Sequence, residues 1–328
     1  MSEQTANNIE QPTVTVVMPL YNAERYVADA VASVMAQTGV ATELIVADDG
    51  SNDRSAEIVE KMARDSQGRI KLLRLKHGGV SKARNGALDV ARGKYVMYLD
   101  ADDMLLPESV KRLTDVAEKL TATDHPIIVA GMTLPGRDYK EAINHESREP
   151  GAMETVGPER AIELSLYRRT PGLDSSMSSK LFSKELFDDL RFRENTRFED
   201  LDLYYRVFGK ASGGITLTDI PVTFYRMHGE SFTHSWSEGQ LDSLAVTRRM
   251  MQRLGDKKRL ARAVADRRVS AAFRLMVVMA RCGEKNRRAM RACRLIIKRH
   301  GASTFMNRQA RLRNRVAALI VSLIPMKR

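Results

Sequence analysis

The sequence predicts an α/β fold, a mostly parallel sheet with helices on both faces, followed by a basic helical region at the C-terminus. Three observations lead to this prediction. Short apolar runs alternate with segments of helical spacing through the first 130 residues. Clusters of polar residues directly follow three of these apolar runs. Charge is divided unevenly, because residues 237–328 hold 24 Lys and Arg against 5 Asp and Glu, whereas residues 1–236 hold 29 and 36.

The first part of the chain gives the clearest alternation of elements. Expected strands cover residues 14–19, 43–49, 70–75, 95–99 and 127–130, and the helices between them cover 23–38, 53–64, 80–91 and 107–120. This alternation is typical of a parallel sheet covered on both faces. Ligands of such sheets bind beyond the carboxyl ends of the strands, where the three polar clusters lie.

The pattern is weaker beyond residue 131. We expect residues 132–175 to run over the sheet as an irregular polar segment. Residues 178–210 should form a short strand and two helices, and residues 214–234 a hairpin followed by a loop. Basic helices should follow a boundary near Trp236.

Composition limits the class of protein. The 328 residues contain two cysteines, Cys282 and Cys293, whose spacing gives neither a metal-binding pair nor a disulfide framework. The polar N-terminus lacks the basic start and apolar run of a secretory signal. No stretch approaches the roughly 18–20 apolar residues that span a bilayer. We therefore expect a cytoplasmic protein.

Three carboxylates, Asp100, Asp102 and Asp103, directly follow the apolar run YVMYL. Asp100 and Asp102 are two residues apart, so in an extended segment they point to one side. Carboxylates held together raise each other's pKa or require a cation, and Mg²⁺ or Mn²⁺ bound to a diphosphate would satisfy them. The alternative is a solvated acidic turn before the helix that Pro107 opens, with Asp103 as its cap.

Two further clusters could bind a nucleotide. Asp48 and Asp49 can accept hydrogen bonds from a ribose or base, although D-D-G-S also suits a turn that leads into a helix. Lys82 and Arg84 begin a helix after a His-Gly-Gly turn, where basic side chains and helix N–H groups suit a pyrophosphate. A solvated helix face is the alternative for this pair.

The second half of the chain offers one carboxylate and one histidine. Asp200 precedes the aromatic segment LDLYYRVF, where partial burial could raise its pKa into the range of a general base. An acidic residue that stabilises the start of a helix is the alternative. His228, in an expected loop, could bind a metal or a phosphate, or could have only a structural role.

Four segments together resemble the motifs of the family 2 inverting glycosyltransferases, which share the Rossmann-like GT-A fold. They are VTVVMPLYNAERYVADAVASVMAQT, ELIVADDGSNDRSAEIV, GVSKARNGALDVARGKYVMYLDADD and FEDLDLYYR. Each segment alone is a weak signal, but the four stand in the order of the family and at similar spacing. The resemblance covers residues 12–120 closely and residues 170–235 more loosely.

The resemblance implies a role for each matched residue. It implies nucleotide binding by Pro19, Tyr21, Asn22, Asp48, Asp49, Lys82, Arg84, Asn85 and Asp100. Asp49 would bind the base, usually uracil. Asp100 and Asp102 match the metal-binding D-x-D motif, with Asp102 in direct contact, and His228 would contact the metal or the diphosphate. Asp200 matches the catalytic base.

The resemblance also implies the activity and its cofactor. We expect an inverting transferase that uses Mn²⁺ or Mg²⁺ and moves a sugar from a nucleotide diphosphate donor, most often a UDP-sugar, to a hydroxyl of a glycan or lipid-linked glycan. Bacterial surface polysaccharide or glycolipid synthesis would be its setting. No Q-x-x-R-W motif follows Asp200, which favours a non-processive enzyme.

The same resemblance divides the chain into domains. A disordered polar N-terminus (1–12) would precede a GT-A domain (13–236), made of a nucleotide-binding half (13–130) and an acceptor and catalytic half (131–236). The basic helical region (237–328) lies outside the core of the family.

The basic region has several interpretations. The apolar run Val316–Ile324 between basic residues suits a helix lying in the headgroup region of an anionic membrane. A solvated bundle or the interface of a homo-oligomer is the alternative. Two other kinds of protein remain open: a nucleic-acid-binding protein, which would use the charge alone, and a non-catalytic protein that binds sugar nucleotides. Few aromatic residues and the acidic body of the chain argue against nucleic acid.

Overall fold

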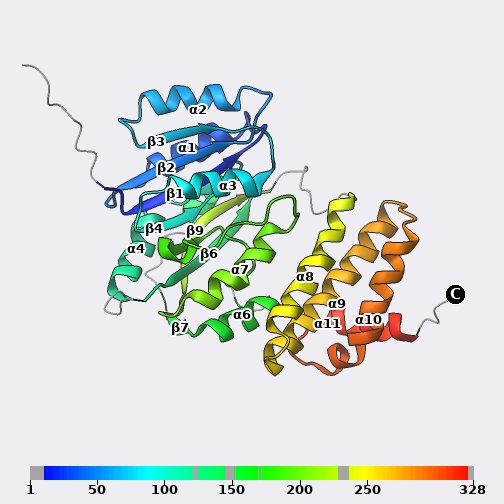
Figure 1. Cartoon of the computed structure of the whole chain (residues 1–328). Coiled ribbons are helices and arrows are strands. Elements are labelled where there is room, and N and C mark those ends of the chain that lie inside the picture. The colour runs from blue at the N-terminus through cyan, green and yellow to red at the C-terminus, as the bar shows by residue number, and fades with distance from the viewer. Residues whose placement is uncertain are drawn as a thin grey trace, which may run out of the picture. The chain divides into compact units, whose positions relative to one another are not determined.

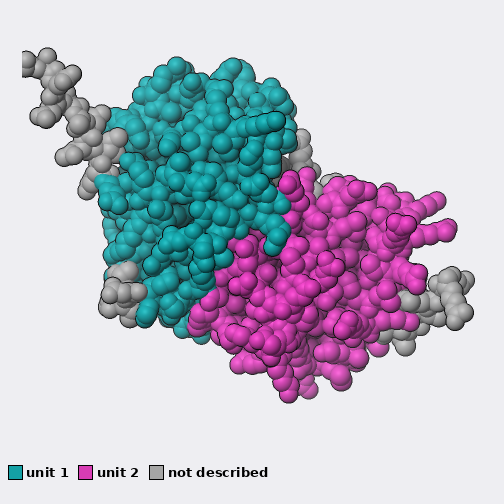
Figure 2. Space-filling view, viewed as in Figure 1, with its two compact units in different colours: residues 1–156, 177–194, 210–227 teal, residues 157–176, 195–209, 228–328 magenta. Residues whose placement is uncertain are grey.

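The structure is a computed structural model that describes residues 11–120, 125–144, 151, 153–168, 170, 172–227 and 236–323. The chain divides into two compact units (Figure 2). Unit 1 comprises residues 1–156, 177–194 and 210–227, and unit 2 comprises residues 157–176, 195–209 and 228–328. The domain boundaries expected at residues 12, 130 and 236 are still predictions.

One nine-stranded sheet runs through the described part of unit 1 (Figure 1). Its strands are β1 (Val14–Leu20), β2 (Thr42–Asp48), β3 (Ile70–Arg74), β4 (Tyr95–Tyr98), β5 (Met104–Leu105), β6 (Ile128–Gly136), β7 (Glu154–Val156), β8 (Lys180–Ser183) and β9 (Ile215–Arg226). The order is β3-β2-β1-β4-β8-β6-β9-β5, with β7 paired to β9. Strands β3, β2, β1 and β4 are parallel, whereas β8 is antiparallel to both of its neighbours.

Helices cover both faces of this sheet, as its apolar strands require. Alternate residues of β1, from Val14 to Leu20, share a core with α1 (Val27–Met35), α2 (Ser55–Arg64) and α4 (Ser109–Leu120). The residues between them point to the opposite face, because successive side chains of a strand alternate. Helix α3 (Val80–Asp89) packs on β1 and β2 but is absent from that core, so it covers the other face. The predicted α/β class is confirmed.

Two predictions for the middle of the chain are wrong. Residues 132–175 are not an irregular segment, because they complete β6 and form α5 (Tyr139–Asn144), β7 and α6 (Pro158–Tyr167). The Pro and Gly residues that suggested a loop are built into these elements. Pro135 pairs with Tyr225 in the β6–β9 ladder, and Pro158 stands in the first turn of α6, where its missing N–H costs nothing.

Residues 214–234 also do not begin with a hairpin. Residues 215–226 form the single long strand β9, which runs parallel to β6. The Asp219-Ile220-Pro221 stretch resembles a turn in the sequence, but in the structure it is part of an irregularity in the β6–β9 register. Leu217 pairs with Ala130 and Pro221 pairs with Met132, so β9 absorbs the extra residues as a bulge.

Unit 2 is helical, which confirms the expected helical region at the C-terminus. Besides α6 and α7 (Glu199–Lys210), it contains α8 (Asp242–Leu254), α9 (Lys258–Arg281), α10 (Arg287–Met306) and α11 (Leu312–Leu323). Residues of α9, α10 and α11 form its core, which includes Leu275, Cys293 and Ile297. Of the helices in the described ranges, none is long and apolar enough to cross a membrane.

Candidate functional site

The loops after β1, β2 and β3 are joined at the carboxyl ends of these strands. The N–H of Asp49 donates to the carbonyl of Leu20 at 2.8 Å, and the N–H of Leu75 donates to that of Asp48 at 2.8 Å. Asp48 and Asp49 are buried. Asp48 accepts a hydrogen bond from the N–H of Ser51, so its carboxylate stabilises the turn that D-D-G-S suggested.

Asp49 holds the turn that begins α3. Its two carboxylate oxygens accept from the N–H groups of Gly78 and Gly79 at 2.8 and 2.7 Å, and His77 Nδ1 lies 2.9 Å from Oδ2. Gly79 has a φ of 90°, a conformation that favours glycine, and is the residue before the first turn of α3. Asp49 therefore supplies a negative charge where a helix N-terminus favours one.

His77 lies in the candidate site, although no motif in the sequence indicates it. Its ring stacks on Tyr21, with centroids 4.7 Å apart and planes inclined by 28°. Both rings are largely exposed, so the pair presents an aromatic surface above Asp49. A histidine in a short Gly-containing turn carries no signal of this role in the sequence, because the stacking partner lies 56 residues away.

Asn22 fixes the loop that follows β1. Its φ is 49°, a left-handed conformation that Asn tolerates, and its N–H donates to Ser51 Oγ at 3.0 Å. Its side-chain oxygen accepts from the N–H of Asn52 at 2.8 Å. Pro19 lies in β1 itself and pairs in register with Ala47. These contacts bring the predicted residues Pro19 and Asn22 to the same sheet edge as Asp49.

The two basic residues at the start of α3, Lys82 and Arg84, have different surroundings. Lys82 is half-buried and its Nζ donates to the carbonyl of Lys76 at 3.0 Å. Arg84 is buried, its Nη2 lies 2.9 Å from Asp100 Oδ1, and its guanidinium lies over the ring of Phe192 at 5.2 Å. Asn85 exchanges two hydrogen bonds with the backbone of Phe192. Arg84 and Asn85 thus position other groups, and any contact with a nucleotide remains a prediction for both.

Negative charge is crowded after β4. Asp103 is buried, and burial raises the pKa of its carboxyl to about 8, with the charges of Asp100 and Asp102 as the next contributions. Asp103 accepts from the N–H of Arg226 at 3.1 Å. It therefore binds the end of β9 and is not the helix cap that the sequence suggested.

Arg226 is a second residue of the candidate site that no sequence motif indicates. Its guanidinium lies 3.0 Å from Asp29 and over the ring of Tyr26 at 5.2 Å, and it donates to the carbonyl of Asp102 at 3.2 Å. It thereby fixes the backbone between Asp102 and Asp103. The partners come from residues 26, 29 and 102, so no local pattern identifies this role.

The residues present fit a divalent cation that a diphosphate helps to bind. Among the described residues, no group of three or more His, Cys, Asp or Glu side chains could hold a metal alone. Mg²⁺ and Mn²⁺ commonly take only one or two protein carboxylates and complete their shell with phosphate oxygens and water. Asp100 and Asp102 can supply such a pair, and 43% of the Asp100 side chain is exposed. His228 lies outside the described residues.

Asp200 lies in unit 2, in the first turn of α7. It is half-buried, whereas Asp202 is buried and pairs with Arg206 and with Arg249 of α8. Two positions along a helix are about 200° apart around its axis, so Asp200 points away from the side that α8 covers. Phe198 precedes the helix with a φ of 59°. Asp202 therefore anchors α7 to α8.

The chain is similar to several known proteins. A match to Bacillus subtilis (strain 168) "Uncharacterized glycosyltransferase EpsJ" is 30% identical over 229 residues, 68% of this chain and 63% of that protein. Another, to Streptococcus pneumoniae serotype 4 "Glycosyltransferase GlyG", is 28% identical and spans 68% of this chain and 75% of that protein.

The fold matches a solved structure. S. aureus TarS 1–349 in complex with UDP-GlcNAc superposes with a TM-score of 0.61 at 19% identity, covering 94% of this chain and 88% of that one. The GT-A fold is thus confirmed. The model of the family described as "Glycosyl transferase family 2" matches residues 15–191, more than half of the chain. The protein is an enzyme that belongs to glycosyltransferase family 2.

Proposed function

We propose that the enzyme is an inverting, metal-dependent, non-processive transferase that moves a sugar from a UDP-sugar to an acceptor hydroxyl. The observation that carries this proposal is the negative charge of the carboxylates Asp100 and Asp102 directly after β4, where 43% of the Asp100 side chain is exposed. A cation that arrives with a diphosphate would offset that charge. UDP-GlcNAc in the TarS complex supports a UDP-sugar as the donor class.

Residues of unit 1 would bind the donor. The exposed Tyr21–His77 pair offers an aromatic surface for the base. Asp49 would bind the base through its remaining acceptor capacity, since a carboxylate has about four lone-pair sites and the N–H groups of Gly78 and Gly79 use two. Asp48, Pro19 and Asn22 form the surrounding edge, and Lys82 would contact the phosphates.

Asp100 and Asp102 would hold Mn²⁺ or Mg²⁺ together with the donor diphosphate. The bound cation would neutralise negative charge on the leaving diphosphate. Arg84 keeps one oxygen of Asp100 in place through the 2.9 Å contact and leaves the rest of that carboxylate exposed. Arg226 holds the backbone of Asp102. The predicted contact of His228 with the metal or diphosphate is part of this proposal.

Asp200 is the proposed general base. It would accept the proton of the acceptor hydroxyl while the acceptor oxygen forms a bond to the anomeric carbon of the donor sugar. The bond from that carbon to the diphosphate breaks on the opposite side, and UDP leaves with the electron pair. Attack opposite the leaving group inverts the anomeric centre, so an α-linked donor gives a β-linked product.

The acceptor is proposed to be a glycan or lipid-linked glycan used for bacterial surface polysaccharide or glycolipid. Because no Q-x-x-R-W motif follows Asp200 in the sequence, we propose transfer of one sugar or a few in each encounter. A lipid-linked acceptor would place the enzyme at the inner face of the cytoplasmic membrane as a peripheral protein.

A screen of nucleotide sugars tests this proposal. UDP release and thermal stability should be measured for UDP-, GDP- and dTDP-sugars, each with Mn²⁺ and with a chelator. We expect one or more UDP-sugars to raise the melting temperature and to release UDP only with the metal. If no nucleotide diphosphate stabilises the protein under any condition, the proposed transfer reaction is wrong.

A further inference from the structure

Helix α11 carries its larger apolar side chains on the exposed side. Leu312, Val316 and Ile320 have exposed fractions of 70%, 45% and 53%. They are spaced four residues apart, so they form one stripe along the helix. The side chains that pack inward are Asn314, Ala317, Ala318 and Val321.

This arrangement is the reverse of an ordinary surface helix. A helix at the surface of a water-soluble bundle buries its large apolar residues and exposes polar ones. In α11, two alanines, an asparagine and one valine, Val321, face the bundle, while a leucine, a second valine and an isoleucine face outward. At the end of α10, Phe305 and Met306 are also exposed, and the guanidinium of Arg315 from α11 lies over the Phe305 ring at 5.9 Å. Contiguous exposed apolar surface marks a site that binds a partner.

Basic residues flank the stripe. Arg313 is exposed, and Arg315 donates from Nε to the carbonyl of Phe305 at 2.8 Å. Around the helix axis these two arginines lie on either side of the stripe, at about 100° and 60° from Leu312. Long basic side chains in these positions can place their charges in a headgroup layer while the apolar face inserts below it.

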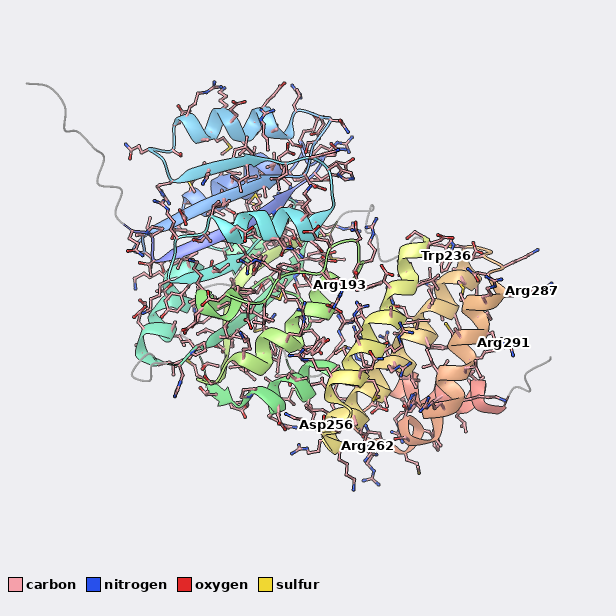
Figure 3. All side chains as sticks on the ribbon, in the orientation of Figure 1. Arg193, Trp236, Asp256, Arg262, Arg287 and Arg291 are labelled. Carbon is pink, nitrogen blue, oxygen red and sulfur yellow. The ribbon has the colours of Figure 1, made fainter. Side chains whose placement is uncertain are left out.

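All charged side chains in the last part of the sequence, from residue 285 onward, are basic. Residues 285–328 contain 13 Lys and Arg and no Asp or Glu. Arg287 and Arg291 project from α10 on the side away from α9 (Figure 3), and both are exposed. Such a segment is complementary to a negatively charged surface and is repelled by another copy of itself.

We propose that the exposed stripe of α11, with its flanking arginines, docks on the surface of a bilayer that contains anionic phospholipid. A second copy of the chain would bring two such segments of one charge together. A nucleic acid would use the charge but would leave the apolar stripe in water. An anionic bilayer accommodates both features, because each basic residue and each buried CH₂ group contributes to binding.

The test is co-sedimentation of the full-length protein with lipid vesicles. Vesicles of phosphatidylcholine are compared with vesicles that also contain phosphatidylglycerol, at low and at high salt. We expect binding to the anionic vesicles to be at least about tenfold tighter, since several basic residues contribute. Val316→Asp or Ile320→Asp should each weaken that binding by at least about tenfold, because apolar contact is lost and a negative charge added. Arg313→Gln should weaken it by about fivefold.

Two controls separate this effect from unfolding and from a general charge effect. Met153→Asp makes a comparable change at an exposed methionine of unit 1 and should bind vesicles as the wild type does. Circular dichroism and the melting temperature of Val316→Asp should match those of the wild type, because the substituted side chain is exposed. As a further measurement, Ile320→Trp fluorescence should be quenched by lipids with brominated acyl chains, whereas Gln252→Trp on α8 should not be.

Three outcomes would overturn the proposal. The first is equal binding of neutral and anionic vesicles with no effect of Val316→Asp. The second is a dimer that Val316→Asp dissociates while no vesicle binding occurs. The third is binding to duplex DNA without binding to vesicles. The proposed glycosyl transfer is judged separately, because UDP release without vesicles should be the same for Val316→Asp and the wild type.

Discussion

The guanidinium of Arg84 lies 2.9 Å from the carboxylate of Asp100, with 4% of the arginine side chain exposed and 43% of the aspartate side chain. The basic residue is thus the buried partner, with its guanidinium over the ring of Phe192, and the acidic one reaches the surface. Arg84, whose contact with a nucleotide is still a prediction, thus positions the first carboxylate of the D-x-D motif. Asp100 is held by one oxygen and can offer the other.

Replacing Arg84 should damage both stability and donor binding. Arg84→Met keeps much of the side-chain volume but removes the hydrogen bond to Asp100 and the charge over Phe192. The free energy of unfolding of Arg84→Met, measured by chemical denaturation, should therefore fall by about 1–3 kcal/mol, the cost of losing a buried hydrogen bond to a charged group. Arg74→Met removes an arginine from an exposed pair with Glu60 and should change stability by less than about 1 kcal/mol. Equal effects of both variants would show that Arg84 has no positioning role.

Asp49→Asn should displace the turn before α3. An asparagine has one acceptor oxygen, so the amide group would face the N–H of Gly78 or Gly79 without a hydrogen bond. The free energy of unfolding should fall by about 1–3 kcal/mol, and the affinity for UDP, measured by calorimetry, should fall as well. Unchanged UDP affinity in a destabilised variant would assign Asp49 to the turn alone.

Asp103 should make stability depend on pH. Burial and the neighbouring charges raise the pKa of its carboxyl to about 8 in the folded protein, above its ordinary value of 3.8. The folded state therefore retains a proton that the unfolded chain releases between these two values. The contribution of this group is fully present below about pH 4 and is lost as pH rises to about 8.

Asp103→Asn tests this dependence. The amide resembles the protonated carboxyl and remains neutral, so it retains the stability that the wild type loses. The variant should unfold at about the wild-type temperature below about pH 4 and be more stable near pH 8, by on the order of a few kcal/mol. A stability difference that does not change with pH would contradict the raised pKa.

Asp102→Ala should remove the effect of the metal on donor binding. The wild type should bind UDP more tightly with Mn²⁺ than with a chelator, because the cation links the carboxylate to the diphosphate. In the variant, affinities measured by calorimetry with and without Mn²⁺ should approach each other. If Mn²⁺ strengthens UDP binding equally in both proteins, Asp102 does not contact the metal.

The sequence was sufficient for the parallel half of the sheet because its signals there are local. Strands such as β1 and β2 are continuous apolar runs bounded by turns, and the helices between them have regular apolar spacing. The carboxyl ends of parallel strands meet at one edge, so the clusters around Asn22 and Asp49 could be placed near each other before the structure was known.

The wrong predictions for residues 132–175 and 214–234 have one physical cause. Strand pairing between segments that are distant in the sequence overrides the local preference of Pro and Gly for turns. Pro221 is typical of a turn, but in the structure it pairs with Met132 of β6 and belongs to β9. The extra residues of β9 form a bulge there. Other contacts have no local signal at all: the amide of Asn85 exchanges two hydrogen bonds with the backbone of Phe192, 107 residues away. His77 and Arg226 also gain their roles from partners remote in the sequence, Tyr21 and Asp29.

The most direct test of glycosyl transfer by this chain compares Asp200→Asn with the wild type at saturating donor. The variant should bind UDP-sugar with an affinity within about twofold of the wild type, while the turnover of acceptor should fall by about 100-fold or more, the usual contribution of a general base. Glu238→Gln, the same charge change at an exposed position of unit 2, should leave turnover unchanged. Full turnover by Asp200→Asn would contradict the proposed mechanism.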